Sequence, residues 1–326
     1  MSDQLPWQID SATPPSFALD LDCDGGARPV SITEAFRRRD VWINLPTRPD
    51  SGDASVLKSH LEFDAYMALT ADETRPRVAV VAGGLLLVVR GINLNAGADP
   101  EDMVSLRMWF DDSRLLTVQR RCLMAVRDLA EDLNAGHGTK SPAALMLALV
   151  ERLIDRMSPL LEELDEHVDQ LEDASLTEPP SKILHELAQH RRRAIALRRH
   201  IAPTRDALSQ LAVLAPEHLG PGSEWTAREL ADQVARYVDD LDEVRDRAAI
   251  AHEFIMSRQS DMLNQRMLLL SIAAAIFLPL GLISGMMGMN VGDLPLTGDN
   301  GFWITTAIIF GVGGLLAGAM KLVRWY

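Results

Sequence analysis

Three acidic residues recur at intervals of seven in the last third of the chain: Asp239, Asp246 and Glu253. An α-helix has about 3.6 residues per turn, so this spacing places the three carboxylates on one helical face. Carboxylates grouped in this way raise the local concentration of cations. The chemistry that this pattern predicts is therefore the attraction of positive ions.

The same face continues into an uncharged stretch, where apolar side chains replace the acidic ones. Its members lie three or four residues apart: Asn264, Met267, Leu270, Ala274, Leu278 and Gly281. A ring of such helices would form an acidic funnel above a narrow apolar throat, and an apolar constriction can gate by dewetting. A solvated acidic face followed by a lipid-facing span explains the pattern equally well, so both interpretations stay open.

Signatures of enzymes and of nucleic-acid-binding proteins are missing. His185 and His190 in HELAQH are five residues apart, about 140° around a helix, so they cannot act as the paired zinc ligands of a metalloprotease. There is no nucleophile elbow, Walker loop or dinucleotide fingerprint. The net charge of −14 disfavours binding to phosphate backbones. We expect neither an enzyme, nor a bound cofactor, nor a nucleic-acid partner, and we expect His167, His200 and His252 at the surface.

Two uncharged stretches, 267–292 and 300–320, are long enough to cross a membrane, which takes roughly 20 residues. Basic residues precede the first stretch and follow the second. The connector between them has no Lys or Arg, and its charged residues are Asp293 and Asp299. The positive-inside rule then places both termini in the cytosol and the connector outside it. Two helices cannot enclose a polar path, so transport would require several copies around one axis.

The remaining chain predicts an α+β cytosolic domain followed by long helices. Strands are expected at Ser16–Leu21, Val41–Leu45, Val78–Val81, Leu85–Ile92, Ser105–Phe110 and Leu115–Gln119. Helices are expected at Ala143–Leu171, Lys182–Leu214 and 224–286. The basic cluster Arg191–Arg199 is expected to pair with the acidic stretch Glu162–Asp173 of a neighbouring helix. The predicted parts are a cytosolic α/β domain (1–140), a helical hairpin (141–222), a stalk helix (223–266), a first transmembrane helix (267–289), an extracytosolic loop (290–300), a second transmembrane helix (301–322) and a cytosolic tail (323–326).

The segment FLPLGLISGMMGMN, Phe277–Asn290, with a second span and a basic tail after it, resembles the CorA-type metal ion transporters. The resemblance in architecture covers nearly the whole chain. It implies an α-helical membrane transporter that assembles as a homopentamer, with the first span lining the pore. It also implies a selectivity motif of Gly288, Met289 and Asn290. There Asn290 would form an outer ring that meets a hydrated ion, Gly288 would leave room at the mouth, and Met289 would pack behind the turn.

Two departures from the magnesium-transporting pattern point to the zinc-transporting ZntB branch of that family. Met287 stands where an aromatic residue usually precedes the motif, and Val291–Pro295 replaces an acidic stretch after it. The segment Gly91–Phe110 also resembles that branch. The resemblance implies zinc transport across the inner membrane and coupling of this transport to the proton gradient. Because the path offers neither His nor Cys, no direct zinc ligands are expected.

Two alternative functions follow from the same residues. The first is a magnesium or cobalt channel of the same fold. The second is a membrane-tethered regulatory or scaffolding protein, in which replacing Asn290 would leave function intact.

Overall fold

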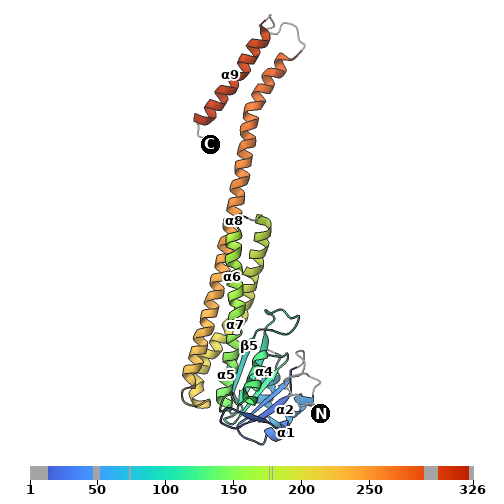
Figure 1. The fold of residues 1–326 in the computed structure, drawn as a ribbon, viewed down its shortest axis with the longest axis vertical. Helices are drawn as coiled ribbons and strands as arrows, with labels where there is room; N and C mark the ends of the chain where they lie inside the picture. Colours follow the sequence, from blue (N-terminus) through green and yellow to red (C-terminus); the bar gives the residue numbers. More distant parts are fainter. Residues whose placement is uncertain are drawn as a thin grey trace. The chain divides into compact units, whose positions relative to one another are not determined.

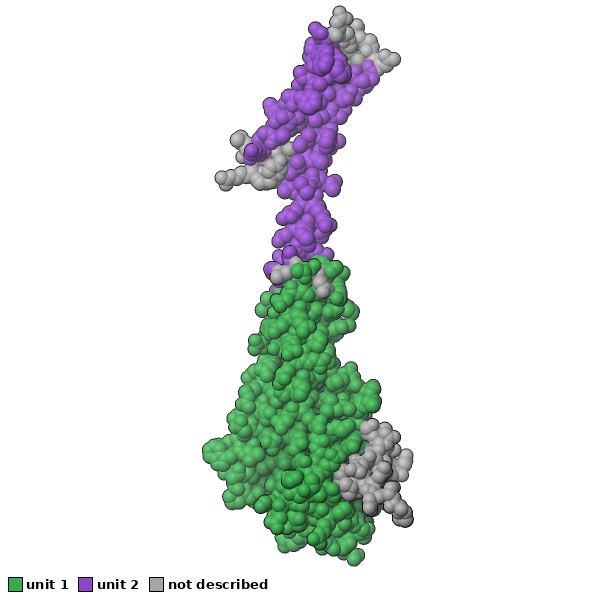
Figure 2. Space-filling view, viewed as in Figure 1, with its two compact units in different colours: residues 1–252 green, residues 253–326 purple. Residues whose placement is uncertain are grey.

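The computed structural model describes residues 14–46, 52–72, 75–175, 177, 179–289 and 300–322. The chain forms two compact units, Met1–His252 and Glu253–Tyr326, which Figure 2 colours separately. Helix α8, Ser223–Met287, begins in the first unit and ends in the second. This confirms the uninterrupted helix that the sequence predicts over 224–286.

A seven-stranded mixed sheet forms the centre of the first unit, with its strands in the order β2-β1-β3-β7-β6-β5-β4. β3 and β7 run parallel, and the other neighbouring strands are antiparallel. All six expected strands are confirmed; β2 was not expected because it is short, lies at the sheet edge and ends in a proline. The strands are β1 Phe17–Leu21, β2 Ala27–Pro29, β3 Val41–Pro46, β4 Arg77–Val81, β5 Gly84–Gly91, β6 Val104–Phe110 and β7 Arg114–Gln119.

Helices cover both faces of this sheet (Figure 1). On one face, Leu86 and Trp109 share a core with the three short helices α1 Ile32–Ala35, α2 Gly52–His60 and α3 Phe63–Thr70. On the other face, a Cβ atom at Gly91 would meet Leu153 of α5, Pro142–Asp155. α4, Met124–Asn134, packs against α5. Because the central strands are buried on both sides, they are continuous apolar runs such as LLLVV in β5.

The connection between β4 and β5 is a two-residue turn that requires positive φ angles. Ala82 has φ of 50° and Gly83 has φ of 74°, a geometry that matches the twist of paired strands. At the next position, a Cβ atom on Gly84 would lie 2.6 Å from the carbonyl oxygen of Phe110 and 2.6 Å from the Trp109 ring. Position 84 therefore has no room for a side chain.

Replacing Gly84 with alanine is expected to lower the free energy of unfolding by about 1–3 kcal/mol, the usual cost of overpacking. Urea unfolding of the full-length protein, followed by tryptophan fluorescence, measures this change. Gly83→Asn is the control, because a Cβ atom at position 83 meets nothing within 4 Å and asparagine tolerates positive φ. Equal stability of the two variants would contradict the close approach of β5 and β6 at Gly84.

The helical segment expected over Ala143–Leu171 is divided into α5 and α6, Ser158–Ala174. Pro159, in the first turn of α6, cannot donate a hydrogen bond to the carbonyl of Asp155, so the helix is interrupted there. α6 and α7, Pro180–His218, form a hairpin, and α8 packs along it within the first unit (Figure 1).

The second unit consists of the end of α8 and of α9, Gly301–Leu322. Pro279 lies inside α8. Both helices are long and apolar enough to cross a membrane. The fold therefore agrees with the predicted class: an α+β domain, a long helix and two apolar carboxyl-terminal helices.

Candidate functional site

The helices of the second unit expose most of their apolar surface. Met267, Leu270 and Leu278 of α8 are 62%, 74% and 71% exposed. On α9, Phe310 and Leu315 are 74% and 72% exposed. Apolar surface of this extent is typical of contact with lipid or with other chains. Most of the surface of these helices is therefore suited to contact with lipid or with other chains rather than with water.

One face of α8 in this unit is already covered by α9. Leu280 Cδ1 lies 3.5 Å from the position that a Cβ atom of Gly313 would take, and glycine at such a contact lets helices approach closely. The half-buried residues of this part of α8 recur every three or four positions, with Pro279 and Leu280 adjacent, so they form one stripe. They are Ile272, Ile276, Pro279, Leu280, Ile283 and Met287.

The stripe predicted from spacing lies on the opposite face of α8. At about 100° per residue, its centre is about 180° from the centre of the stripe that faces α9. All six of its residues are exposed in the single chain: Asn264, Met267, Leu270, Ala274, Leu278 and Gly281. α9 therefore leaves this face of α8 uncovered. That the stripe lines a pore stays a prediction.

At the end of α8, the backbone turns at the predicted selectivity motif. The amide of Gly288 donates to the carbonyl of Ser284 at 3.0 Å, and the amide of Met289 donates to the carbonyl of Met286 at 3.4 Å. A Cβ atom at Gly288 would lie 3.3 Å from the Ser284 oxygen, so glycine suits this position. Met289 is 49% exposed. Asn290 lies outside the described residues, and its role stays a prediction.

The acidic residues of the predicted funnel are exposed. Asp239, Asp246 and Glu253 are all solvent-accessible, whereas the opposite face of α8 buries Val238, Leu241 and other apolar residues. Asp246 contacts its neighbour Arg245 at 2.8 Å. The recurring carboxylates thus lie on the side of α8 that does not pack on the rest of its own unit.

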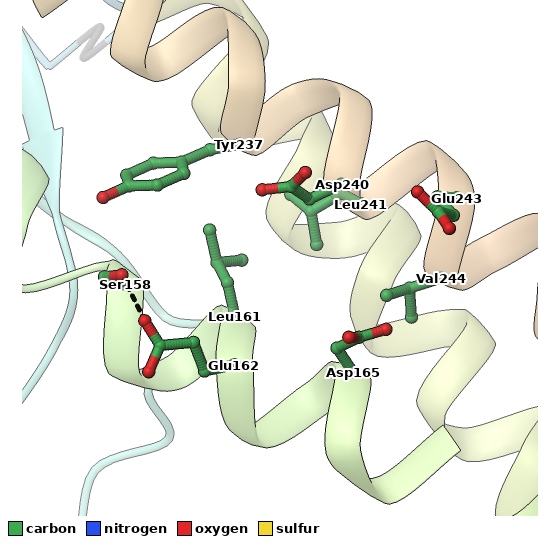
Figure 3. Close-up of a pocket in the computed structure, with 9 residues that line it drawn as sticks. All are labelled: Ser158, Leu161, Glu162, Asp165, Tyr237, Asp240, Leu241, Glu243 and Val244. Carbon is green, nitrogen blue, oxygen red and sulfur yellow. Dashed lines mark hydrogen bonds between the residues drawn. The ribbon is translucent and has the colours of Figure 1, made fainter. Parts of the chain in front are cut away.

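A second group of acids, in which part of the acidic stretch Glu162–Asp173 meets residues of α8, lies between α6 and α8 (Figure 3). Asp165 of α6 and Asp240 and Glu243 of α8 line a hollow of about 190 Å³. Glu162 also lines it and accepts a hydrogen bond from Ser158 at 2.7 Å. Burial raises the pKa of Asp240, and the charges of Glu243, Asp165 and Asp239 raise it further. The hollow therefore gathers negative charges that repel one another.

Replacing Asp240 with asparagine is expected to stabilise the protein at neutral pH. A carboxyl whose pKa is raised by folding stabilises the folded state only below its ordinary pKa, and this contribution is lost as the pH rises through the raised value. The variant should therefore melt higher than the parent at pH 7 and equally at pH 3. Asp232→Asn, on the same helix but outside the hollow, is the control. A lower melting temperature at pH 7 would show that Asp240 is stabilising.

The acidic stretch of α6 is bound by α8 rather than by the basic cluster of α7. Arg247 of α8 contacts Asp165 at 2.8 Å and Glu172 at 3.1 Å, and it also contacts Asp169. The prediction that the basic cluster of α7 pairs with this stretch is wrong. Packing brings Arg247 of α8 onto the acidic face of α6 instead, and this contact cannot be read from the spacing of residues in the sequence.

The basic cluster of α7 has other partners. Arg193 pairs with Glu101 at 2.5 Å, and Arg198 pairs with Asp242 of α8 at 2.8 Å. His167 is exposed, as expected, whereas His200 and His252 are half-buried, and His200 contacts Arg90. Burial, and next the charge of Arg90, lower its pKa.

Within the described residues, no group of three or more His, Cys, Asp or Glu side chains is placed to hold a metal ion. The described part of α8 offers exposed carboxylates and a helical face that α9 leaves uncovered.

Residues 40–321 match the family model described as "CorA-like Mg2+ transporter protein". The divalent cation transporter CmaX of Pseudomonas aeruginosa is 36% identical over 304 residues, which cover 92% of each chain. The zinc transport protein ZntB of Pectobacterium carotovorum is 29% identical over 315 residues, which cover 94% of this chain and 95% of ZntB.

Solved structures show the same fold. The structure of full-length CmaX superposes with a TM-score of 0.81 at 30% identity and covers 97% of this chain and 99% of that one. The CorA magnesium transporter of Methanocaldococcus jannaschii superposes with a TM-score of 0.80 at 18% identity, covering 95% of this chain and 98% of its own.

Proposed function

Because the chain belongs to the family of CorA-like Mg²⁺ transporters, we propose that it carries divalent cations, zinc first among them, across the inner membrane. The observation that carries this proposal is the uncovered face of α8. It holds a stripe from Asn264 to Gly281, and the stripe lies opposite the face that packs on α9.

The transport route requires more than one copy of the chain. Five copies of α8 arranged around an axis would turn their uncovered faces inward, with α9 outside them toward lipid. Asn290 would then form a ring of carboxamides at the outer mouth, where an ion pauses without being trapped by fixed charge. The exposed carboxylates Asp239, Asp246 and Glu253 would concentrate cations at the cytosolic end.

Zinc is favoured by two observations. ZntB, a relative that aligns over nearly its whole length, is a zinc transport protein. The residues around the motif, Met287 before it and Val291–Pro295 after it, also depart from the magnesium-transporting pattern. The absence of His and Cys from the proposed stripe means that zinc would pass largely hydrated. We also propose that transport is coupled to the proton gradient and that both termini lie in the cytosol.

Uptake into proteoliposomes tests the ion and the coupling together. Radioactive zinc and magnesium are offered at equal gradients, with and without a pH step across the membrane. Zinc uptake that exceeds magnesium uptake and responds to the pH step is expected. Magnesium flux with negligible zinc flux would instead establish the alternative function, a magnesium channel, which the family description and the fold of the CorA magnesium transporter favour.

A further inference from the structure

A cavity of about 670 Å³ lies in the first unit, between the start of β4 and the middle of α7. It is separate from the acidic hollow between α6 and α8, with which it shares no residue. Its walls come from the segment before β4, from β5 and from α7. They are Arg75, Pro76, Arg77, Arg90, Arg199, His200, Pro203, Asp206, Ala207 and Gln210.

The lining is strongly positive in a chain whose net charge is −14. Among the residues that the structure describes, it brings four arginines together with one carboxylate, Asp206, and that carboxylate already contacts Arg205 at 3.0 Å. Like charges gathered in this way repel one another. Burial lowers the pKa of Arg90, and the charges of Arg199 and Arg75 lower it further. An anion in the cavity would relieve this repulsion.

His200 adds a hydrogen-bond donor to the cavity. Its Nδ1 contacts the Nη1 of Arg90. Arginine has no acceptor atom, so Nδ1 must accept this hydrogen bond, and the neutral ring then carries its proton on Nε2. Arg90 and His200 thereby fix each other's orientation at the cavity wall, one from β5 and one from α7. Such fixed donors need no rearrangement to bind an anion.

The chemistry of the lining selects for phosphate groups. Guanidinium groups bind phosphate oxygens through paired hydrogen bonds, and four of them exceed what one phosphate group needs. Among the described residues, the lining holds no Leu, Ile, Val, Met, Phe, Tyr or Trp side chain, so it offers no large apolar surface for an acyl chain. We propose that this cavity binds a soluble polyphosphate, with a pyrophosphate group as the smallest unit that it recognises.

Calorimetric titration of the full-length protein in detergent tests this site. Pyrophosphate, triphosphate and inorganic phosphate are added separately, in buffer freed of divalent cations so that chelation does not contribute. One pyrophosphate or triphosphate per chain is expected, bound more tightly than inorganic phosphate, with an affinity that falls as salt is raised. No binding of pyrophosphate, or binding no tighter than that of inorganic phosphate, would overturn the proposal.

Variants locate the binding within the molecule. Arg199→Gln and Arg77→Gln are each expected to weaken pyrophosphate binding roughly tenfold, the effect of one charge-assisted hydrogen bond. Arg199→Lys, which keeps the charge and loses the paired geometry, should fall between the parent and Arg199→Gln. Arg37→Gln makes the same change of charge at an exposed position outside the cavity and should bind like the parent. Equal weakening of pyrophosphate binding by Arg37→Gln would show that the effect comes from the net charge of the protein, and it would overturn the proposed site.

Two readouts keep this test separate from the transport proposal. Melting temperatures without ligand show whether each variant is folded, and Arg199, being exposed, is expected to tolerate replacement. Zinc uptake by the same Arg199→Gln protein in liposomes reports on transport alone. Loss of pyrophosphate binding with normal uptake supports a distinct anion site.

Discussion

Replacing Asn290 with alanine is expected to reduce zinc uptake to the level of liposomes without protein. The carboxamide is proposed to be the polar group that meets the hydrated ion at the outer mouth, and alanine offers no oxygen to replace it. A ring of five such groups would lose every member at once, because each copy carries the change. Initial rates of zinc uptake into proteoliposomes measure the effect.

Asn300→Ala is the matched control. It removes the same group at the other end of the connector, immediately before α9, where no role in transport is proposed. Its uptake should equal that of the parent, and Asn290→Ala should keep the parent's melting temperature. Wild-type uptake by Asn290→Ala would show that Asn290 has no selectivity role. It would then favour the alternative function, a membrane-tethered regulatory or scaffolding protein.

Cysteine introduced at Leu278 is expected to react with a water-soluble, positively charged thiol reagent, and this reaction should abolish transport. Leu278 is 71% exposed on the face of α8 that α9 leaves uncovered. If that face borders water in the assembly, the thiol becomes accessible and the bulky charged adduct fills the narrowest part of the route. The experiment starts from a protein in which Cys23 and Cys122 are replaced by serine and alanine.

Ile283→Cys is the control, since Ile283 is half-buried on the stripe that faces α9. Its thiol should stay unmodified under the same conditions, and its transport should be unaffected by the reagent. Protection of the Leu278→Cys thiol, with reactivity only toward a membrane-soluble reagent, would show that the stripe contacts acyl chains. The open alternative of a lipid-facing span would then be correct.

Much of the fold is predictable from local sequence because each element satisfies its own rules. The run LLLVV of β5 is apolar throughout, as a strand buried on both faces requires, and the run VAVV of the edge strand β4 is mostly β-branched, which favours an extended backbone. Strand β2 was not predicted because ARP carries no such pattern, and its extended conformation comes from pairing with β1. The helical break before Pro159 follows from the missing amide hydrogen, a signal that was present but was outweighed by the apolar periodicity around it.

The candidate site is predictable to a lesser extent. Residues three or four apart identify a helical face, so the stripe on α8 could be found from spacing alone. Which face α9 covers depends on Leu280 meeting Gly313, a contact between residues far apart in the sequence. The Arg247 contacts with α6 and the arginine-lined cavity are likewise products of packing. Charge runs show that ionic contacts exist but do not show which side chains meet.

The proline inside α8 gives the uncharged stretch a polar atom that no side chain supplies. Pro279 has no amide hydrogen, so the main-chain oxygen of Ala275 lacks the donor that an α-helix ordinarily provides four residues later. Between Met267 and Gly288, every side chain except Ser271 and Ser284 is apolar, so this oxygen is a hydrogen-bond acceptor in an otherwise apolar stretch. It points along the helix toward Pro279, which lies on the stripe that faces α9, so the free acceptor lies away from the stripe proposed to line the pore. Substituting Pro279 would return that oxygen to the helix without altering any residue of the proposed pore stripe.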